Sequence, residues 1–179
     1  MKMSPVQLME ATILKLYVEP NFDLDSELSE RDFEFEDIDF EVSKGIGNAD
    51  SFWADTSHDF GDIEARSVRL SLGIRTTPPA KSPYYFEIMC GGVFAILDPE
   101  YKGPTSNDRL LWQSGLSMLF GRIREILSAT TLKMPSGELL LPTMSFMDDS
   151  PPVNWREEQQ EVLDTDSPPQ LADLSKSAD

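Results

Sequence analysis

The sequence predicts an α+β fold in which four antiparallel strands precede one long helix. Four segments, near residues 8–18, 32–42, 63–76 and 83–97, carry the two-residue alternation or the β-branched and aromatic residues typical of strands. Near 108–130, apolar residues instead recur at helical spacing. Strands first and helices last are typical of an antiparallel sheet with helices packed on one side.

The first two predicted strands have clear ends and an unequal charge. The strand near 8–18 ends at Pro20, because proline has no N–H to donate to a ladder. The strand near 32–42 has acidic residues between its apolar ones, and its apolar parity changes near Glu36 and Asp37. This change predicts a bulge that returns both apolar sets to one face.

Residues that interrupt strands precede and separate the last two predicted strands. Residues 45–62 contain glycine, asparagine and aspartate at short intervals, which predicts a loop. The strands near 63–76 and 83–97 follow as partners across a proline-rich turn. Gly91 and Gly92 in the middle of the last strand favour a bulge or bend over a flat ladder.

The predicted helix begins at a polar cap and contains two glycines. Asn107 or Asp108 can cap its first turn. Gly115 and Gly121 lower helix propensity, so we interpret them as positions where a second element approaches closely. We expect one domain over 1–150, followed by an acidic C-terminal region over 151–179 with a short helix and a disordered tail.

The net charge of −17 is confined to two segments of the 179-residue chain. Residues 19–41 hold eleven carboxylates and one arginine, and residues 148–179 hold nine carboxylates and two bases. Such a distribution repels nucleic acid and anionic membranes. It predicts a basic protein partner or a divalent cation, or it serves only to keep the protein soluble.

The residue types that enzymes and metal sites need are scarce. Cys90 is the single cysteine and lies in an apolar strand, so we expect a small buried hydrophobe and no disulfide. His58 is the single histidine, with no sequence context for a catalytic triad. We therefore predict no catalytic residue, no metal and no cofactor. The absence of a long apolar run and of a signal-peptide pattern predicts a cytoplasmic protein.

The last predicted strand is apolar on both parities. Tyr84, Phe86 and Ile88 alternate with Tyr85 and Met89, so both faces of this strand carry large side chains. One face can pack on the helix, and the other must meet a subunit or a ligand. This pattern predicts an oligomer.

Three segments in chain order resemble the SecB family of protein-export chaperones: 87–94 with its Gly-Gly, 119–125 in the helix, and the leucine-rich proline loop 139–146. The resemblance implies ATP-independent binding of unfolded preproteins, delivery to the SecA motor of the Sec translocase, and a tetramer built as a dimer of dimers. A specialised relative dedicated to one client, such as an antitoxin, is the alternative. A small ligand-binding or enzymatic domain is a third hypothesis.

Two sets of site residues follow. The resemblance implies a surface for the basic tail of SecA, formed by Glu87, Tyr85, Glu19 and Asp23. A client groove needs aromatic and flexible apolar side chains. Our prediction for its lining is Tyr17, Phe52, Trp53, Leu140, Leu141 and Met144.

Overall fold

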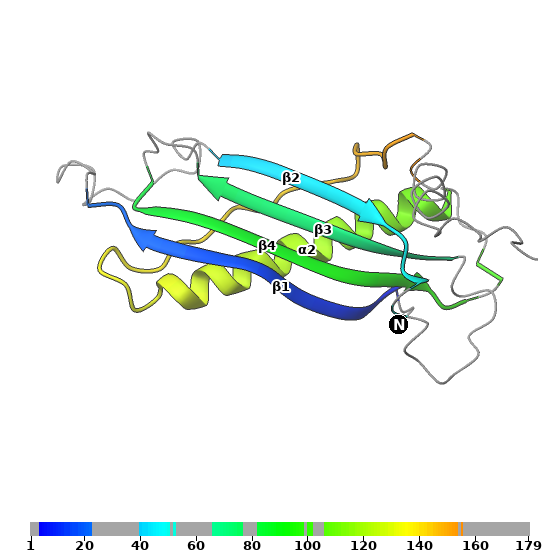
Figure 1. Cartoon of the computed structure of the whole chain (residues 1–179), viewed down its shortest axis with the longest axis horizontal. Helices are drawn as coiled ribbons and strands as arrows, with labels where there is room; N and C mark the ends of the chain where they lie inside the picture. The colour runs from blue at the N-terminus through cyan, green and yellow to red at the C-terminus, as the bar shows by residue number, and fades with distance from the viewer. Residues whose placement is uncertain are drawn as a thin grey trace, which may run out of the picture.

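The computed structural model describes residues 4–22, 40–50, 52, 66–76, 82–98, 100–101, 106–153 and 155. The elements are, in chain order, β1 (Val6–Pro20), β2 (Phe40–Gly47), β3 (Ser67–Thr76), β4 (Tyr84–Ile96) and α2 (Asn107–Thr131). The strands form one antiparallel sheet in the order β1-β4-β3-β2, and α2 crosses one side of it (Figure 1). The predicted α+β fold class is confirmed.

The prediction for the second strand is wrong at its C-terminal end. β2 continues to Gly47, although the glycines from Gly45 onward predict a loop. Gly45 is paired with Ser71 of β3, whose Oγ would lie 2.5 Å from a Cβ at that position. The glycine is therefore needed for close cross-strand contact. The bulge predicted at 36–37 lies outside the described residues.

Gly91 and Gly92 mark irregular pairing, but the extra residues are on the neighbouring strand. The register between β1 and β4 shifts between Leu8 and Glu10 and again between Ile13 and Lys15, on either side of the two glycines. A Cβ on Gly92 would stand 2.7 Å from the carbonyl oxygen of Glu10. The bulged strand thus comes too close to β4 for a side chain there.

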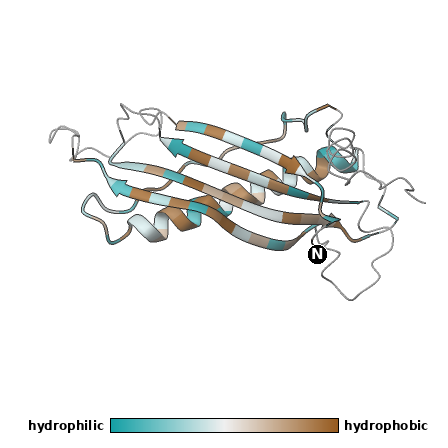
Figure 2. Ribbon diagram, in the orientation of Figure 1, coloured by the Kyte–Doolittle hydropathy of each residue, from teal (hydrophilic) through white to brown (hydrophobic). Residues whose placement is uncertain are grey.

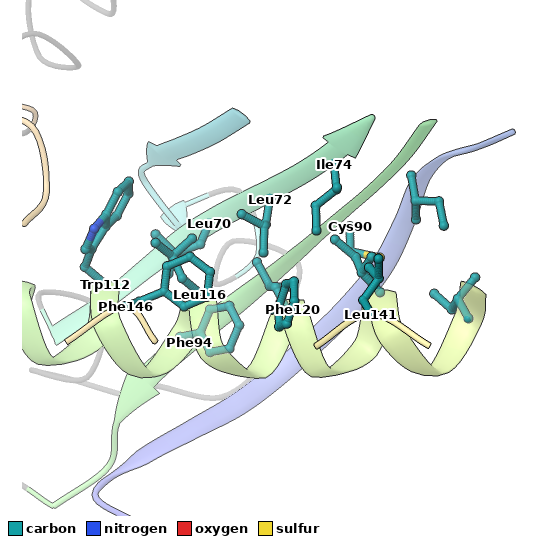
Figure 3. Close-up of a cluster of buried hydrophobic side chains, with 14 of the residues drawn as sticks. Leu70, Leu72, Ile74, Cys90, Phe94, Trp112, Leu116, Phe120, Leu141 and Phe146 are labelled. Atoms are coloured by element: carbon teal, nitrogen blue, oxygen red, sulfur yellow. The ribbon is translucent and has the colours of Figure 1, made fainter. Parts of the chain in front are cut away.

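The core lies between the sheet and α2. Alternate residues of β3 and β4 and one side of α2 are buried together (Figure 3). Gly115 permits the contact, because a Cβ there would lie 2.4 Å from a methyl carbon of Leu70. The expectation of close approach is confirmed for Gly115, whereas a Cβ on Gly121 would meet nothing within 4 Å. Cys90 is buried in this core, as expected.

The start of α2 corrects one detail of the sequence prediction. Ser106, rather than Asn107 or Asp108, is the N-cap residue, and its Oγ accepts a hydrogen bond from the Arg109 N–H at 3.4 Å. The N-cap is one residue before the first predicted cap position, because Asn107 is already the first residue of the helix. The short helix predicted near Trp155 lies almost entirely outside the described residues; Trp155 itself is buried in the core.

After α2, residues 138–149 form a segment without helix or strand that ends in a turn at 147–148. We call it the strap, and it lies on the helix side of the sheet. Leu139, Leu141 and Phe146 are buried in the core. The preceding turn is fixed to the sheet by the Tyr84 hydroxyl, which donates to the Gly137 carbonyl at 2.6 Å. The strap therefore shares with α2 the covering of one face.

We call the opposite side of the sheet the outer face. On β4 it carries Tyr85, Glu87 and Met89, which are partly buried, whereas Val93 and Ala95 further along are buried. A second small cluster covers Val93 and Ala95 and consists of Ala49, Val93, Ala95, Met9 and Phe52. Part of the second apolar face is thus covered by this chain itself, without a subunit or a ligand.

Candidate functional site

β1 is an edge strand with an unusual number of exposed apolar side chains. Its neighbour is β4 on one side, and the sheet ends on the other. Five large apolar residues of β1 are between 44% and 56% exposed: Leu8, Ile13, Leu14, Leu16 and Tyr17. Figure 2 shows apolar positions spread along the whole strand. An open edge with this composition is a surface that a monomeric protein normally avoids.

The five side chains are divided between the two faces. Leu8, Ile13 and Leu16 are paired with buried core residues of β4, so they lie on the α2 side, because directly opposed residues share a face. Leu14, at a register shift, lies beside Gly91 on the outer face, and Tyr17 is opposite Glu87 there. β1 therefore exposes apolar side chains on both the α2 side and the outer face of the sheet.

Three of the four residues predicted to bind the basic tail meet at one end of the outer face. Glu19 is paired with Tyr85, and the neighbouring Tyr17 is paired with Glu87. With Arg75 they line an open hollow of about 520 Å³, which we call the acid–tyrosine hollow. The fourth predicted residue, Asp23, lies outside the described residues.

Glu87 is already paired within the molecule. Lys15 of β1 reaches the Glu87 carboxylate, with Nζ 2.5 Å from Oε2. Arg75 is opposite Glu87 on β3, but its guanidinium binds Glu41, with Nε 2.7 Å from Oε2. The Lys15–Glu87 pair is partly exposed and contributes about 0–1 kcal/mol. A stronger external cation can therefore exchange with Lys15 at little cost.

In the acid–tyrosine hollow, Tyr17 offers a polar hydroxyl group in addition to its apolar ring. A hydrogen bond to Glu19 raises the pKa of Tyr17, and the nearby charge of that carboxylate adds to the effect. The Tyr17 hydroxyl is thus the donor in this pair and the Glu19 carboxylate the acceptor. The hollow thus combines aromatic surface with carboxylate acceptors, a combination that suits an ammonium or guanidinium group.

A second hollow, of about 350 Å³, lies further along the sheet between β1 and β2. Leu14 and Arg69 border it, and its lining includes Gly45, Ser71 and Gly91. Because glycine and serine have little or no side chain, the surface is hollow here, and the Leu14 side chain projects beside the hollow. Apolar contact here comes mainly from one β1 side chain.

The predicted client-groove residues are scattered rather than gathered in one groove. Leu140 is 63% exposed, Met144 is partly buried against the core, and Phe52 covers the outer face far from both in sequence. Leu141 is 1% exposed, so the expectation that it is accessible is wrong, because the strap turns alternate residues into the core. Trp53 lies outside the described residues.

The described residues offer little for other chemistry. They contain no group of three histidine, cysteine, aspartate or glutamate side chains that could hold a metal ion. Within the same residues, no helix combines the length and the apolar character needed to span a membrane. Burial raises the pKa of the Cys90 thiol, which disfavours a reactive thiolate.

The comparisons with known proteins give two likenesses of fold. The chain is similar to the SecB-like chaperone Rv1957 of Mycobacterium tuberculosis, solved with a ChAD peptide from the HigA1 antitoxin, at 16% identity and a TM-score of 0.43, over 78% of this chain and 91% of that one. It is also similar to a protein of unknown function from Streptococcus agalactiae, at 14% identity and a TM-score of 0.42. This likeness covers 76% of this chain and 96% of that one. No family model and no curated protein matches the chain.

Sequence reasoning did not identify two residues that shape this surface. The pairing of Lys15 with Glu87 depends on the β1–β4 register. A regular strand would put Leu14 on the same face as Leu16, but the register shift between Ile13 and Lys15 places it on the outer face. Neither effect has a signal in the local hydrophobic pattern, because both depend on where the partner strand lies.

Proposed function

We propose that the protein is an ATP-independent chaperone that holds unfolded polypeptide chains, and not an enzyme. The observation that supports this is the exposed apolar surface of the edge strand β1, where Leu14 and Tyr17 of the outer face are about half exposed. Unfolded chains expose apolar surface that is worth about 25 cal/mol per Å² when it is buried. Exposed side chains such as Leu14 and Tyr17 bind such surface with little sequence preference.

Contact through side chains suits this edge better than strand addition does. The register shifts at Leu8–Glu10 and Ile13–Lys15 interrupt the regular ladder of β1. A bulged edge pairs poorly with an arbitrary incoming strand. We therefore place clients mainly on Leu14 and Tyr17 of the outer face and on the exposed Leu140.

We propose that the cytoplasmic form is a tetramer, built as a dimer of dimers. The α2 side of β1 supports this, because Leu8, Ile13 and Leu16 are exposed where the cover provided by α2 ends. The same three residues of a second copy could pack against them and bury this apolar surface. Four chains carry 4 × −17, or −68, so we expect assembly to strengthen with salt, which screens charges beyond about 8 Å at physiological ionic strength. A monomer by light scattering at high salt contradicts this proposal.

We propose that the acid–tyrosine hollow binds the basic tail of a SecA-type motor and so connects the chaperone to export. Glu87→Lys is expected to abolish binding of a lysine-rich peptide, because the new cation repels the ligand. Lys15→Met is expected to strengthen binding, because it removes the internal competitor of Glu87. Glu125→Lys is the matched control, since Glu125 forms an exposed ion pair on α2. Calorimetry that finds equal affinities for all four proteins excludes this docking surface.

Suppression of aggregation tests the chaperone proposal and separates its two forms. Several unrelated proteins are diluted from denaturant with and without the chain, in the absence of nucleotide, and light scattering is followed. Protection of most of them supports a general chaperone. Protection of one, such as a single antitoxin, supports the dedicated-client form. Protection of none, together with tight binding of a metabolite, supports the ligand-binding alternative.

A further inference from the structure

The strap is held in place mainly by side chains, unlike the strands beside it. Among the described residues, its backbone hydrogen bonds to backbone groups are local, such as Asp149 N–H to the Phe146 carbonyl at 3.1 Å. Its carbonyls are instead bound by side chains of α2. Arg124 Nε donates to the Leu141 carbonyl at 2.7 Å, and Gln113 Nε2 donates to the Asp149 carbonyl at 2.9 Å.

The strap is anchored by two apolar side chains that alternate, as in a bound extended peptide, and by a third, Phe146, five residues further on. Leu139 and Leu141 point inward and Leu140 points outward. Phe146 packs edge-on against Phe120 of α2, with ring centroids 6.0 Å apart, and Figure 3 shows Leu141, Phe146 and Phe120 in one buried cluster. Apolar pockets at alternate positions, with donors for main-chain carbonyls, are general features of extended-peptide recognition.

One ionic contact holds the far end of the strap to β2. Lys44 Nζ lies 2.6 Å from Asp149 Oδ2 and 5.4 Å from the centroid of the Phe146 ring. Both contacts depend on the same ammonium group, at the end of a side chain that is 29% exposed. Removing that charge weakens the strap without changing a buried apolar residue.

From these contacts we infer that the strap is an exchangeable internal occupant of a peptide-binding channel that runs beside α2 on the same face of the sheet. The channel is formed by Lys44, Gln113, Phe120, Arg124 and Thr131, which contact the strap. Its external ligand is a stretch of unfolded polypeptide with two large apolar side chains two residues apart and a third five residues further on, the spacing of Leu139, Leu141 and Phe146. Release of the strap opens the channel, and the client segment then takes the places of Leu139, Leu141 and Phe146.

This inference rests on the proposed chaperone function and adds a regulated second site to the exposed β1 surface. A client that needs the open state binds with an affinity reduced by the fraction of open molecules. Weakening the Lys44 contact raises that fraction, so it strengthens client binding. Exposed ion pairs and cation–π contacts of this size change such a population by roughly fivefold.

The experiment compares Lys44→Met with Arg122→Met in the full-length protein. Each variant removes one cation, but Arg122 pairs with Glu125 on the exposed side of α2, away from the strap contacts. The probe is a reduced, carboxymethylated and fluorescently labelled protein that cannot fold. Lys44→Met is expected to bind it about fivefold more tightly than the parent, and Arg122→Met equally tightly.

Hydrogen exchange gives a second readout that does not depend on the variant. Addition of the unfolded probe to the parent is expected to speed exchange of the Leu139 amide, which now donates to Thr131 Oγ1 at 2.8 Å. A synthetic peptide of residues 137–150 is expected to compete with the probe, and the same peptide with Leu139, Leu141 and Phe146 changed to serine is not. Probe binding with equal affinity for both variants and an unchanged Leu139 amide overturns the inference. A parent that binds no probe instead refutes the proposed function.

Discussion

Replacing Gly92 by alanine tests how closely β1 approaches β4, on which the presentation of the exposed apolar residues depends. The added Cβ would lie 2.7 Å from the Glu10 carbonyl oxygen, 3.1 Å from a Leu8 methyl carbon and 3.2 Å from the Phe94 ring. Backbone oxygen cannot move aside without shifting β1. Overpacking of this kind costs about 1–3 kcal/mol of unfolding free energy.

Gly121→Ala is the control within the same chain. A Cβ at Gly121 meets nothing within 4 Å, and the residue is inside α2. Alanine is favoured over glycine there by about 0.5–1 kcal/mol, so this variant is expected to be more stable than the parent.

Equilibrium urea unfolding, followed by tryptophan fluorescence at one protein concentration, measures both effects. A fixed concentration is required because assembly shifts the apparent stability. If Gly92→Ala is as stable as the parent while Gly121→Ala is stabilised, β1 does not approach β4 as the structure describes.

Two further predictions concern buried polar groups. Tyr84→Phe removes the hydrogen bond to the Gly137 carbonyl and is expected to lower the unfolding free energy by about 1 kcal/mol. Burial raises the pKa of Tyr84 above its usual 10.0, so the stability that this hydroxyl contributes is present below pH 10 and is lost as the pH rises further. Urea titrations above pH 10 should therefore show a smaller difference in unfolding free energy between Tyr84→Phe and the parent than titrations at neutral pH. The Cys90 thiol is buried with a raised pKa, so a thiol reagent at pH 8 should react with it only as fast as the protein unfolds, and rapid labelling of the native protein contradicts its burial.

Much of the fold follows from patterns that a single element carries. Buried residues recur at every second position of β3 and of the first half of β4, with mostly less buried residues between them, and α2 repeats its apolar residues at helical spacing. These periods are local properties of the chain, and they gave the correct element types. The same reasoning treated Gly45 as a breaker, because its value lies in the serine that it accommodates on the next strand.

The site was less predictable because it depends on register and on the strap. Tyr17, Glu19, Tyr85 and Glu87 could be chosen from sequence, yet only the pairing of β1 with β4 brings them together. The inward turn of Leu141 has no periodic signal, since the strap is extended without a strand partner among the described residues and follows the surface of α2. Proline and leucine composition alone did not separate its buried positions from its exposed ones.

The most direct test of the account is the binding of a permanently unfolded protein by the chain and by a double variant of β1, Leu14→Ser with Tyr17→Ser. Both side chains are on the outer face and about half exposed, so the changes should leave the fold intact, which circular dichroism can verify. Fluorescence anisotropy without nucleotide is expected to show binding by the parent, weakened at least tenfold in the double variant, which corresponds to a loss of about 1.4 kcal/mol. Equal binding by the two proteins, or no binding by the parent, would contradict the claim that the exposed apolar surface of β1 holds unfolded chains.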